Sequence, residues 1–285
     1  MATWALFSFL PTFLLAQSTI SSSNRWAWGS STGWINCRTD TTNGARIGEY
    51  ACAGYLYSAA TAWISLGNGH PTNGIRYMNA ATNDYGVNND GKGNLRGYAW
   101  SDSVGWVNFE STGAPYVDLR TGCVTGYAWS ATMGWIGFSN MAWFLQSDVL
   151  DAGSDDDHDG MPDSWERDKT GNTNMLSATG DYDNDGIPDP LEYAAGTNPT
   201  NAGSLLEISC VGVTNGTSVT IVWPSVPERT YRIQASSNLI DFSGWVDSGL
   251  GLLSAGSSSS SAQQVSLGSF TQRFFRVKAI VPLSE

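Results

Sequence analysis

Two acidic segments that share one twelve-residue pattern constrain the fold of this chain more than any other feature. The first, at residues 155–166, reads DDDHDGMPDSWE, and the second, at residues 181–192, reads DYDNDGIPDPLE. Both place carboxylates at positions one, three, five, nine and twelve, and glycine at position six. Carboxylates at this density repel one another unless a cation lies between them. Each segment is therefore expected to be loose when empty and ordered when a cation is bound.

The spacing suits calcium, which prefers six to eight oxygen ligands at roughly 2.3–2.6 Å. Alternate residues direct carboxylates to one point, glycine permits a sharp turn, position seven contributes its backbone carbonyl, and the last glutamate supplies two oxygens. The alternative is a solvated acidic linker, but two complete matches favour about two calcium ions. The predicted ligands are Asp155, Asp157, Asp159, Met161, Asp163 and Glu166 in the first loop, and Asp181, Asp183, Asp185, Ile187, Asp189 and Glu192 in the second.

Residues from about 155 to 201 resemble bacterial thrombospondin type 3 repeats, which are extracellular calcium-binding modules. The resemblance rests on the pattern Asp-x-Asp-x-Asp-Gly-x-Pro-Asp-x-x-Glu and on Gly-Thr-Asn-Pro at residues 196–199. EF-hands share this loop. Pro162 and Pro188 at position eight, however, lack the N–H through which paired EF-hand loops bond to each other. A static calcium-binding connector is therefore predicted rather than a calcium sensor.

A short helix is expected after each acidic loop. Asp163 and Asp189 can cap these helices, and Gly171 and Gly196 can end them. Neither helix is long enough to offer a large apolar face that calcium could expose.

The rest of the chain has the composition of a β protein with many turns. Its 285 residues suffice for two or three domains, and only 14% are charged, while 32 are glycine and 13 are tryptophan. The net charge of −12 argues against nucleic acid and anionic membrane surfaces as partners. Of the 26 acidic residues, 13 lie between residues 151 and 192, so bound calcium would neutralise much of the excess.

Residues 1–18 are typical of a secretory signal peptide. The stretch Trp4–Ala16 is apolar and too short to span a bilayer. Ala-Gln-Ser at residues 16–18 provides a cleavage site, although no lysine or arginine lies near Met1. The alternative is a buried N-terminal strand or helix. We expect a secreted, extracellular or cell-surface protein with no membrane span once the signal is removed.

Four cysteines can form disulfides in an exported protein. They are Cys37, Cys52, Cys123 and Cys210, which allow three pairings that the sequence does not distinguish. Cys37 and Cys52 are closest in the chain and are the preferred pair. Cys210 lies in a separate predicted domain, where a free, buried thiol is expected.

A tryptophan-rich motif recurs four times within a predicted domain at residues 19–147. The copies begin at residues 25, 54, 97 and 126, and the longer middle step carries an insertion rich in Asn and Gly. The third copy, GYAWSDSVGWVN, shows the alternation of large and small residues around a short turn. The motif resembles repeats of secreted bacterial proteins and implies no activity. Its two aromatic sites are occupied by Trp28, Tyr57, Trp100 and Trp129, and by Trp34, Trp63, Trp106 and Trp135.

Each copy is expected to form about three short antiparallel strands. Units this small must stack or form a ring to bury apolar surface, as a propeller-like ring or a β-solenoid. The two aromatic sites lie six residues apart and so share one face, which is predicted to be the core. The alternative is that exposed aromatics stack on sugar rings, for which Tyr77 and Tyr85 in the insertion are the better candidates.

Residues 148–203 form the predicted calcium-binding connector, and residues 204–285 form a third domain. Its apolar runs, such as VTIVW at residues 219–223, alternate at period two between turns. About six or seven short strands favour a β-sandwich that resembles fibronectin type III or immunoglobulin-like modules. The predicted fold class is therefore mostly β.

Together these features favour a secreted, non-catalytic structural or adhesive protein whose calcium loops rigidify the connection between two β-domains. The alternatives are a carbohydrate-binding protein that uses aromatic loop residues and a subunit of an extracellular filament. The expected partners are calcium and a cell-surface or matrix polysaccharide or protein, or a second copy of the chain. No nucleophile–base pair is evident, because His70 lies in a Gly-His-Pro loop and His158 in the first acidic loop. An enzyme is therefore not expected.

Overall fold

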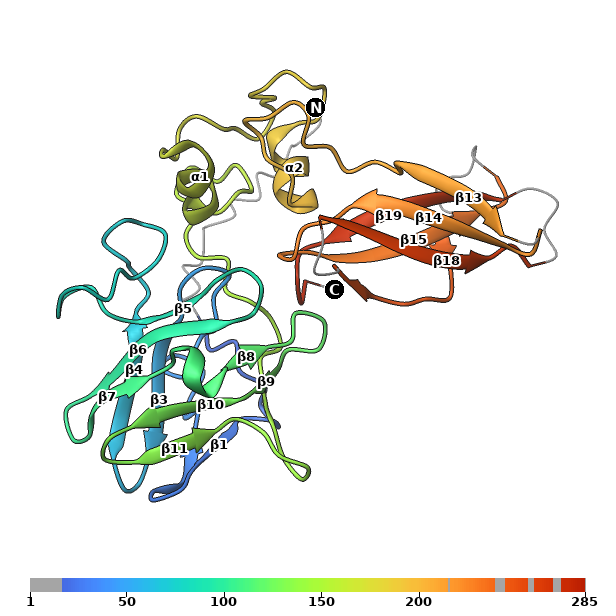
Figure 1. Ribbon diagram of the computed structural model, residues 1–285. Coiled ribbons are helices and arrows are strands. Elements are labelled where there is room, and N and C mark those ends of the chain that lie inside the picture. The colour runs from blue at the N-terminus through green and yellow to red at the C-terminus, as the bar shows by residue number, and fades with distance from the viewer. Residues whose placement is uncertain (1–16, 215, 239–243, 256–258, 269–272, 285) are drawn as a thin grey trace, which may run out of the picture.

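A computed structural model describes residues 17–214, 216–238, 244–255, 259–268 and 273–284. The described chain is mostly β-structure, as predicted, with two short α-helices. Residues 1–16, most of the predicted signal peptide, lie outside the described residues. Figure 1 shows three consecutive parts: the N-terminal strands (blue to green), a two-helix segment (yellow) and the C-terminal strands (orange to red). Within the described ranges, no helix is long and apolar enough to cross a membrane.

The N-terminal part is a closed antiparallel barrel of eight strands. Each repeat forms one hairpin, and each hairpin pairs edge to edge with its two neighbours. Ser65 of the second repeat pairs with Trp100 of the third and closes the ring. The hairpins are β1 (Trp26–Gly29) with β2 (Gly33–Asn36), β3 (Ala53–Ser58) with β4 (Ala62–Asn68), β6 (Leu95–Ser101) with β7 (Gly105–Asn108), and β10 (Tyr127–Ser130) with β11 (Gly134–Gly137).

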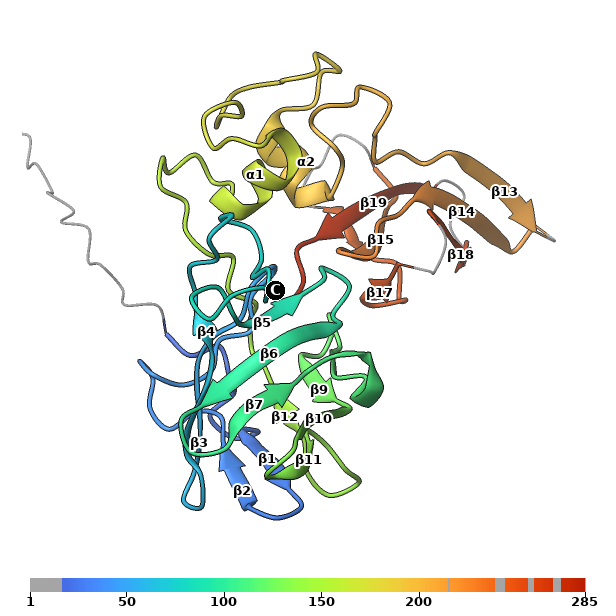
Figure 2. The same cartoon turned by 60° about the vertical axis from the view of Figure 1, so that its left-hand side comes forward.

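Of the two predicted arrangements, a stack and a ring, the repeats adopt a ring, but both predicted forms of the assembly, a propeller and a solenoid, are wrong. The repeat is a two-stranded hairpin whose outer edges bond to the next hairpin, so the eight strands form one continuous closed sheet. A propeller would instead arrange separate sheets around a channel. β5 (Val87–Asn89), from the insertion, pairs with β6 beside the ring. Figure 2 shows β6 and β7 crossing the front of the barrel.

Small and branched side chains fill the barrel interior. In the third hairpin, Ala99 lies opposite Val107, and both are fully buried. An eight-stranded barrel is only just wide enough to be filled by side chains, so a small residue opposite a branched one fits where two indoles do not. The other hairpins contribute Ala27 with Ile35, Leu56 with Ile64, and Ala128 with Ile136.

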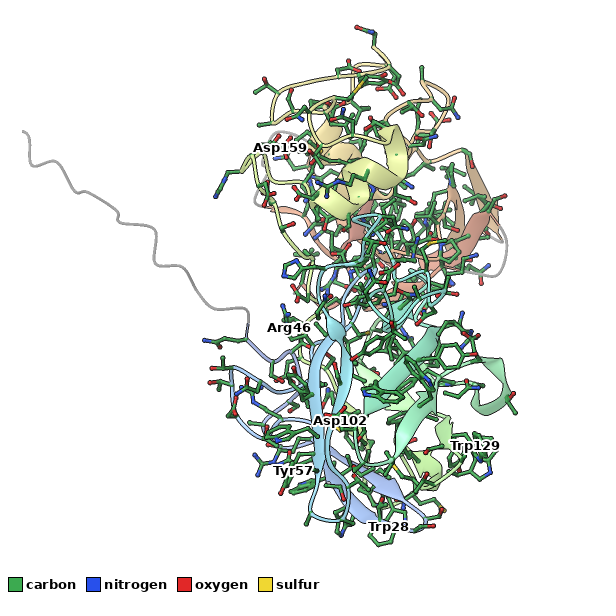
Figure 3. All side chains as sticks on the ribbon, turned by 90° about the vertical axis from the view of Figure 1, so that its left-hand side faces the viewer. Trp28, Arg46, Tyr57, Asp102, Trp129 and Asp159 are labelled. Atoms are coloured by element: carbon green, nitrogen blue, oxygen red, sulfur yellow. The ribbon has the colours of Figure 1, made fainter. Side chains whose placement is uncertain are left out.

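The prediction that the repeated aromatics form the core is therefore wrong. The two aromatic sites of each hairpin do lie opposite each other on one face, as Trp28 and Trp34 show, but that face is the outside of the barrel. Exposed fractions range from 37% for Tyr57 to 48% for Trp34, and only Trp100 is half-buried. Figure 3 shows Trp28, Tyr57 and Trp129 at the periphery of the barrel.

The two ends of the barrel segment pair with each other. Ile20 forms an antiparallel bridge with Ser147. The Ser147 hydroxyl donates to Thr19 Oγ1 at 2.8 Å, and the Asp148 N–H donates to the Thr19 carbonyl at 2.8 Å. We call this pairing of residues 19–21 with residues 146–148 the end clamp. It lies beside a small sheet of β8 (Tyr116–Val117), β9 (Cys123–Thr125) and β12 (Leu145–Gln146), which follows the 3-10 helix η1 (Ser111–Gly113).

The preferred disulfide between Cys37 and Cys52 does not form, because both residues are free, buried thiols, and Cys123 is also free. The register of β2 on β3 places Asn36 opposite Tyr57, so Cys37 does not face Cys52. Burial raises the pKa of both thiols to about 12, which keeps them protonated at neutral pH. The side chain of Cys210 lies outside the described residues.

The C-terminal part consists of two antiparallel sheets that share one hydrophobic core. Trp223 from one sheet and Tyr231 from the other are both buried there, with ring centroids 5.8 Å apart. The prediction of a C-terminal β domain is confirmed. One sheet contains β13 (Cys210–Thr214), β14 (Ser218–Pro224) and β18 (Ser260–Ser266), and the other contains β15 (Thr230–Ser236), β16 (Val246–Asp247), β17 (Leu253–Ser254) and β19 (Phe274–Ile280).

Candidate metal centre

Both acidic loops fold in the same way. In the first loop, the Asp155 carboxylate accepts hydrogen bonds from the backbone N–H groups of Asp159 (3.2 Å) and Gly160 (3.1 Å). The Asp181 carboxylate accepts the corresponding bonds in the second loop, at 3.1 and 2.9 Å. Glycine at position six has a φ of 91° in the first loop and 94° in the second, a left-handed conformation that favours glycine. The repeated pattern thus produces a repeated structure.

Carboxylates from positions one, three and five converge in each loop, as the alternate spacing predicts. One oxygen from each of the three side chains lies within 4.8 Å of the other two. Figure 3 shows Asp159 next to the first helix. The two triads are Asp155, Asp157 and Asp159, and Asp181, Asp183 and Asp185.

Each loop leads into a short helix, α1 (Asp163–Thr170) or α2 (Asp189–Ala195). The helices end at Gly171 (φ 76°) and Gly196 (φ 77°), as predicted. The predicted aspartate caps are wrong by one residue. The proline at position eight occupies the cap with extended backbone, and no side chain caps either helix.

The aspartate at position nine closes the loop from within. The buried Asp163 carboxylate accepts a hydrogen bond from the N–H of Asp156 at 3.0 Å and another from the hydroxyl of Ser154 at 2.7 Å. Asp189 is equally buried and accepts hydrogen bonds from the N–H of Ser177, which precedes its loop, and from the N–H of Tyr182, the second residue of the loop. These bonds hold the loop ends together. That the aspartate at position nine binds calcium, directly or through water, stays a prediction. That the backbone carbonyl at position seven binds calcium also stays a prediction.

The glutamates at position twelve are fully buried without adequate hydrogen-bond donors. Neither carboxylate oxygen of Glu166 has a hydrogen-bond partner, and Oε2 of Glu192 has none, while its Oε1 accepts from the Thr197 hydroxyl at 3.1 Å. Burial, with added repulsion from the loop aspartates, raises the pKa of Glu166 to about 8. Burial and the same kind of repulsion raise the pKa of Glu192 to about 7, although the bond from Thr197 opposes the shift.

These unpartnered oxygens are the structural test of the calcium prediction. A buried carboxylate without a donor is costly unless a cation compensates it. Further buried oxygens without partners belong to Asp159, Asp183 and Asp185 of the two triads. The sites therefore offer only oxygen atoms, several of them unsatisfied, which is the donor set that a hard cation such as Ca²⁺ prefers. The residues present fit the predicted ion.

Tyr193, the residue after Glu192, contacts all three parts of the molecule. Its hydroxyl donates to Oε1 of Glu49 in the barrel segment at 2.9 Å. Its carbonyl accepts hydrogen bonds from Arg229 of the C-terminal domain, whose guanidinium also lies 5.2 Å from the Tyr193 ring. Its ring packs edge-on against Trp165 of α1, with the ring centroids 5.3 Å apart. We call Glu49, Trp165, Tyr193 and Arg229 the junction cluster.

Three of the four members of the junction cluster are buried, and Tyr193 is half-buried. Glu49 is 9% exposed and Arg229 is 4% exposed. Burial raises the pKa of Glu49, while attraction to Arg229 and the bond from Tyr193 lower it and leave a net upward shift. Beside the cluster, the guanidinium of Arg76 lies 4.5 Å from the centroid of the Tyr50 ring and 4.0 Å from the Asp168 carboxylate, which adds a contact between the barrel segment and α1. A cavity of about 90 Å³ lies between these residues.

Sequence reasoning did not identify the junction cluster. Glu49 and Tyr193 are 144 residues apart in the chain, so no local pattern connects them. One signal was present: Glu49 stands among apolar residues between Ile47 and Ala53, where an ionisable side chain requires a partner.

A scan against protein-family models finds no match for this chain, and searches of curated proteins and of solved structures also find none.

Proposed function

We propose that this chain is a secreted, non-catalytic structural or adhesive protein in which calcium holds two β domains in a fixed relation. The observation that carries the proposal is the position of the junction cluster next to both candidate calcium sites. Trp165 precedes Glu166 and Tyr193 follows Glu192 in the chain. The rings of Trp165 and Tyr193 pack against each other with their centroids 5.3 Å apart. The last ligand of each loop is thus covalently adjacent to an aromatic residue of the joint.

Calcium would act by neutralising buried carboxylates. The predicted ligands of the second loop are the Asp181, Asp183 and Asp185 triad with Glu192, and the first loop has the equivalent set. Without a cation, the ionised forms of Glu166 and Glu192 are destabilised by burial and by repulsion from the loop aspartates, and their pKa values are raised accordingly. Ion binding would remove this opposition and fix the first turn of each helix. Because α2 carries Tyr193, order in the second loop is transmitted to contacts with both β domains.

Secretion is supported by the apolar segment at residues 4–16, and extracellular calcium is abundant enough to fill weak sites. The thrombospondin type 3 resemblance agrees with a connector role. We also propose that the two C-terminal sheets form a sandwich of the fibronectin type III or immunoglobulin kind. The two sheets around Trp223 and Tyr231 support this reading.

Small-angle X-ray scattering tests the proposal. In calcium the protein should have one maximum dimension, and in EDTA this dimension should increase and the scattering should indicate a mixture of shapes. Glu192→Gln should shift the calcium-loaded profile towards the EDTA profile. Asp156→Asn is the matched control, because it removes a carboxylate from an exposed position of the first loop outside the ligand pattern. Identical profiles in calcium and EDTA would contradict the proposal.

A further inference from the structure

An open pocket of about 420 Å³ lies on the outer face of the third hairpin, away from the calcium loops. Three aromatic rings, those of Tyr85, Tyr98 and Trp106, form one side of it. The turn at residues 79–82, which belongs to the insertion between the second and third repeats, forms the other side. We call this site the Trp106 pocket. Its volume falls within the range of about 300–1,000 Å³ that is usual for small-molecule sites.

Trp106 is the central ring of the pocket. The Tyr85 ring packs edge-on against Trp106, with the ring centroids 5.2 Å apart and an interplanar angle of 83°. The Tyr98 ring packs against it in the same way, with the centroids 6.2 Å apart and an angle of 74°. Trp100 supports it from the neighbouring strand at 4.6 Å. Trp106 nevertheless remains 43% exposed. Perpendicular neighbours fix the orientation of the indole while leaving ring surface open to a ligand.

The turn opposite the rings is held in place by hydrogen bonds of its own. The buried Asp84 carboxylate accepts bonds from the N–H of Thr72 at 3.1 Å, the Thr72 hydroxyl at 2.9 Å and the N–H of Met78 at 3.1 Å. The Asn79 side chain accepts from the N–H of Gly86 at 3.0 Å. A turn fixed in this way loses little conformational freedom when a ligand binds, which favours affinity.

The lining of the pocket contains no charged side chain. A phosphate, carboxylate or cationic ligand would find no countercharge there, and the net charge of −12 further disfavours an anion. Aromatic surface on one side, with the amide of Asn79 and the hydroxyl of Thr82 on the other, matches a ligand with an apolar face and a hydroxylated edge. A pyranose ring has both features, since its C–H groups can cover an aromatic ring while its hydroxyls bond at the rim.

We propose that the Trp106 pocket binds a neutral hexopyranose unit of a polysaccharide. The open side allows the polymer to continue past the bound unit, so internal units of a chain qualify. Tyr85, one of the two insertion tyrosines named from the sequence, belongs to the pocket. The other, Tyr77, is buried in the barrel segment and is excluded.

The repeats provide an internal control. Trp135 occupies the same position in the fourth hairpin, opposite Trp129, and is 43% exposed like Trp106. The fourth hairpin is not preceded by an insertion like the one that carries residues 79–82 in front of the third hairpin. Trp106→Ala and Trp135→Ala therefore remove the same side chain from equivalent exposed sites, and only the first change affects the proposed pocket.

Affinity electrophoresis of the full chain in calcium tests the proposal. Native gels would contain hydroxyethyl cellulose, galactomannan or dextran as neutral probes, and polygalacturonate as an anionic probe. At least one neutral probe should retard the protein. Trp106→Ala and Tyr85→Ala should each weaken that binding about tenfold, as expected for loss of one stacked ring, while Trp135→Ala should leave it unchanged. Matching thermal melts would show that the variants fold.

Several results would overturn the proposal. They are the absence of retardation by all three neutral polymers, retardation by polygalacturonate alone, and equal losses in Trp106→Ala and Trp135→Ala. Sedimentation velocity provides a further check: a dimer of the wild-type chain that Trp106→Ala abolishes would assign the pocket to a second copy of the chain. The calcium proposal does not depend on any of these outcomes, because its readout is the shape of the protein.

Discussion

Removal of one hydroxyl group should loosen the joint. In Tyr193→Phe the ring keeps its contacts with Trp165 and Arg229, but Glu49 loses the donor that lies 2.9 Å from its Oε1. A hydrogen bond to a charged group contributes about 1.5–3 kcal/mol, so at a pH where the buried Glu49 is ionised the joint should lose about 2 kcal/mol. This corresponds to about a thirtyfold increase in the population of the open joint.

Hydrogen–deuterium exchange of the calcium-loaded protein measures this opening without global unfolding. Amides at residues 44–53 and 189–196 should exchange about thirtyfold faster in Tyr193→Phe. The matched control is Tyr182→Phe, which removes a hydroxyl from an exposed tyrosine in the second acidic loop and should change exchange little. Loss of the bond also raises the pKa of Glu49 further. The difference between Tyr193→Phe and wild type should therefore shrink as the pH falls through that pKa and Glu49 becomes neutral. Unchanged exchange in Tyr193→Phe, or an equal effect of Tyr182→Phe, would refute the assigned role of the junction cluster.

Further outcomes are expected for calcium binding, for pH and for substitutions in the barrel. Calcium at a thousandfold excess over its Kd should stabilise the protein by about 4 kcal/mol per site relative to EDTA. Scanning calorimetry should show this as a higher melting temperature in calcium. A melting temperature that does not change with calcium would contradict the proposed sites. In EDTA, the stability of the fold should decrease as the pH rises from 4.5 through about 8, because the folded chain must then hold Glu166 and Glu192 charged. Calcium affinity, measured by titration calorimetry, should weaken as the pH falls below about 7. Calcium binding that does not depend on pH would contradict the ligand assignment. Ile35→Ala should destabilise the barrel by about 2–5 kcal/mol in urea melts, while Trp34→Ser should cost far less, and the reverse order would mean that the aromatics face inward.

The acidic loops could be predicted in detail because their structure is local. The spacing of Asp155, Asp157 and Asp159 brings three carboxylates together, and Gly160 permits the turn, within six consecutive residues. The ends of both helices followed from glycines in the same way. Only the helix starts differed, because proline took the cap position that aspartate was expected to hold.

The barrel could be predicted only in part. Period-two alternation separates Ala99 and Val107 from Trp100 and Trp106, but it does not say which set faces inward. The choice is made by closure of the ring through Ser65 and Trp100, which limits the width of the interior. That limit is a property of all four hairpins together. The larger apolar side chains were therefore assigned to the wrong face.

The end clamp determines how the barrel segment would respond to mechanical tension. Thr19 and Asp148 lie at the same end of the clamp, because the two segments run antiparallel with Ile20 opposite Ser147. Tension between the chain on either side would therefore open the bonds of Thr19 and Ser147 one after another, as a zipper opens. The four hairpins would bear no load until that zipper had parted.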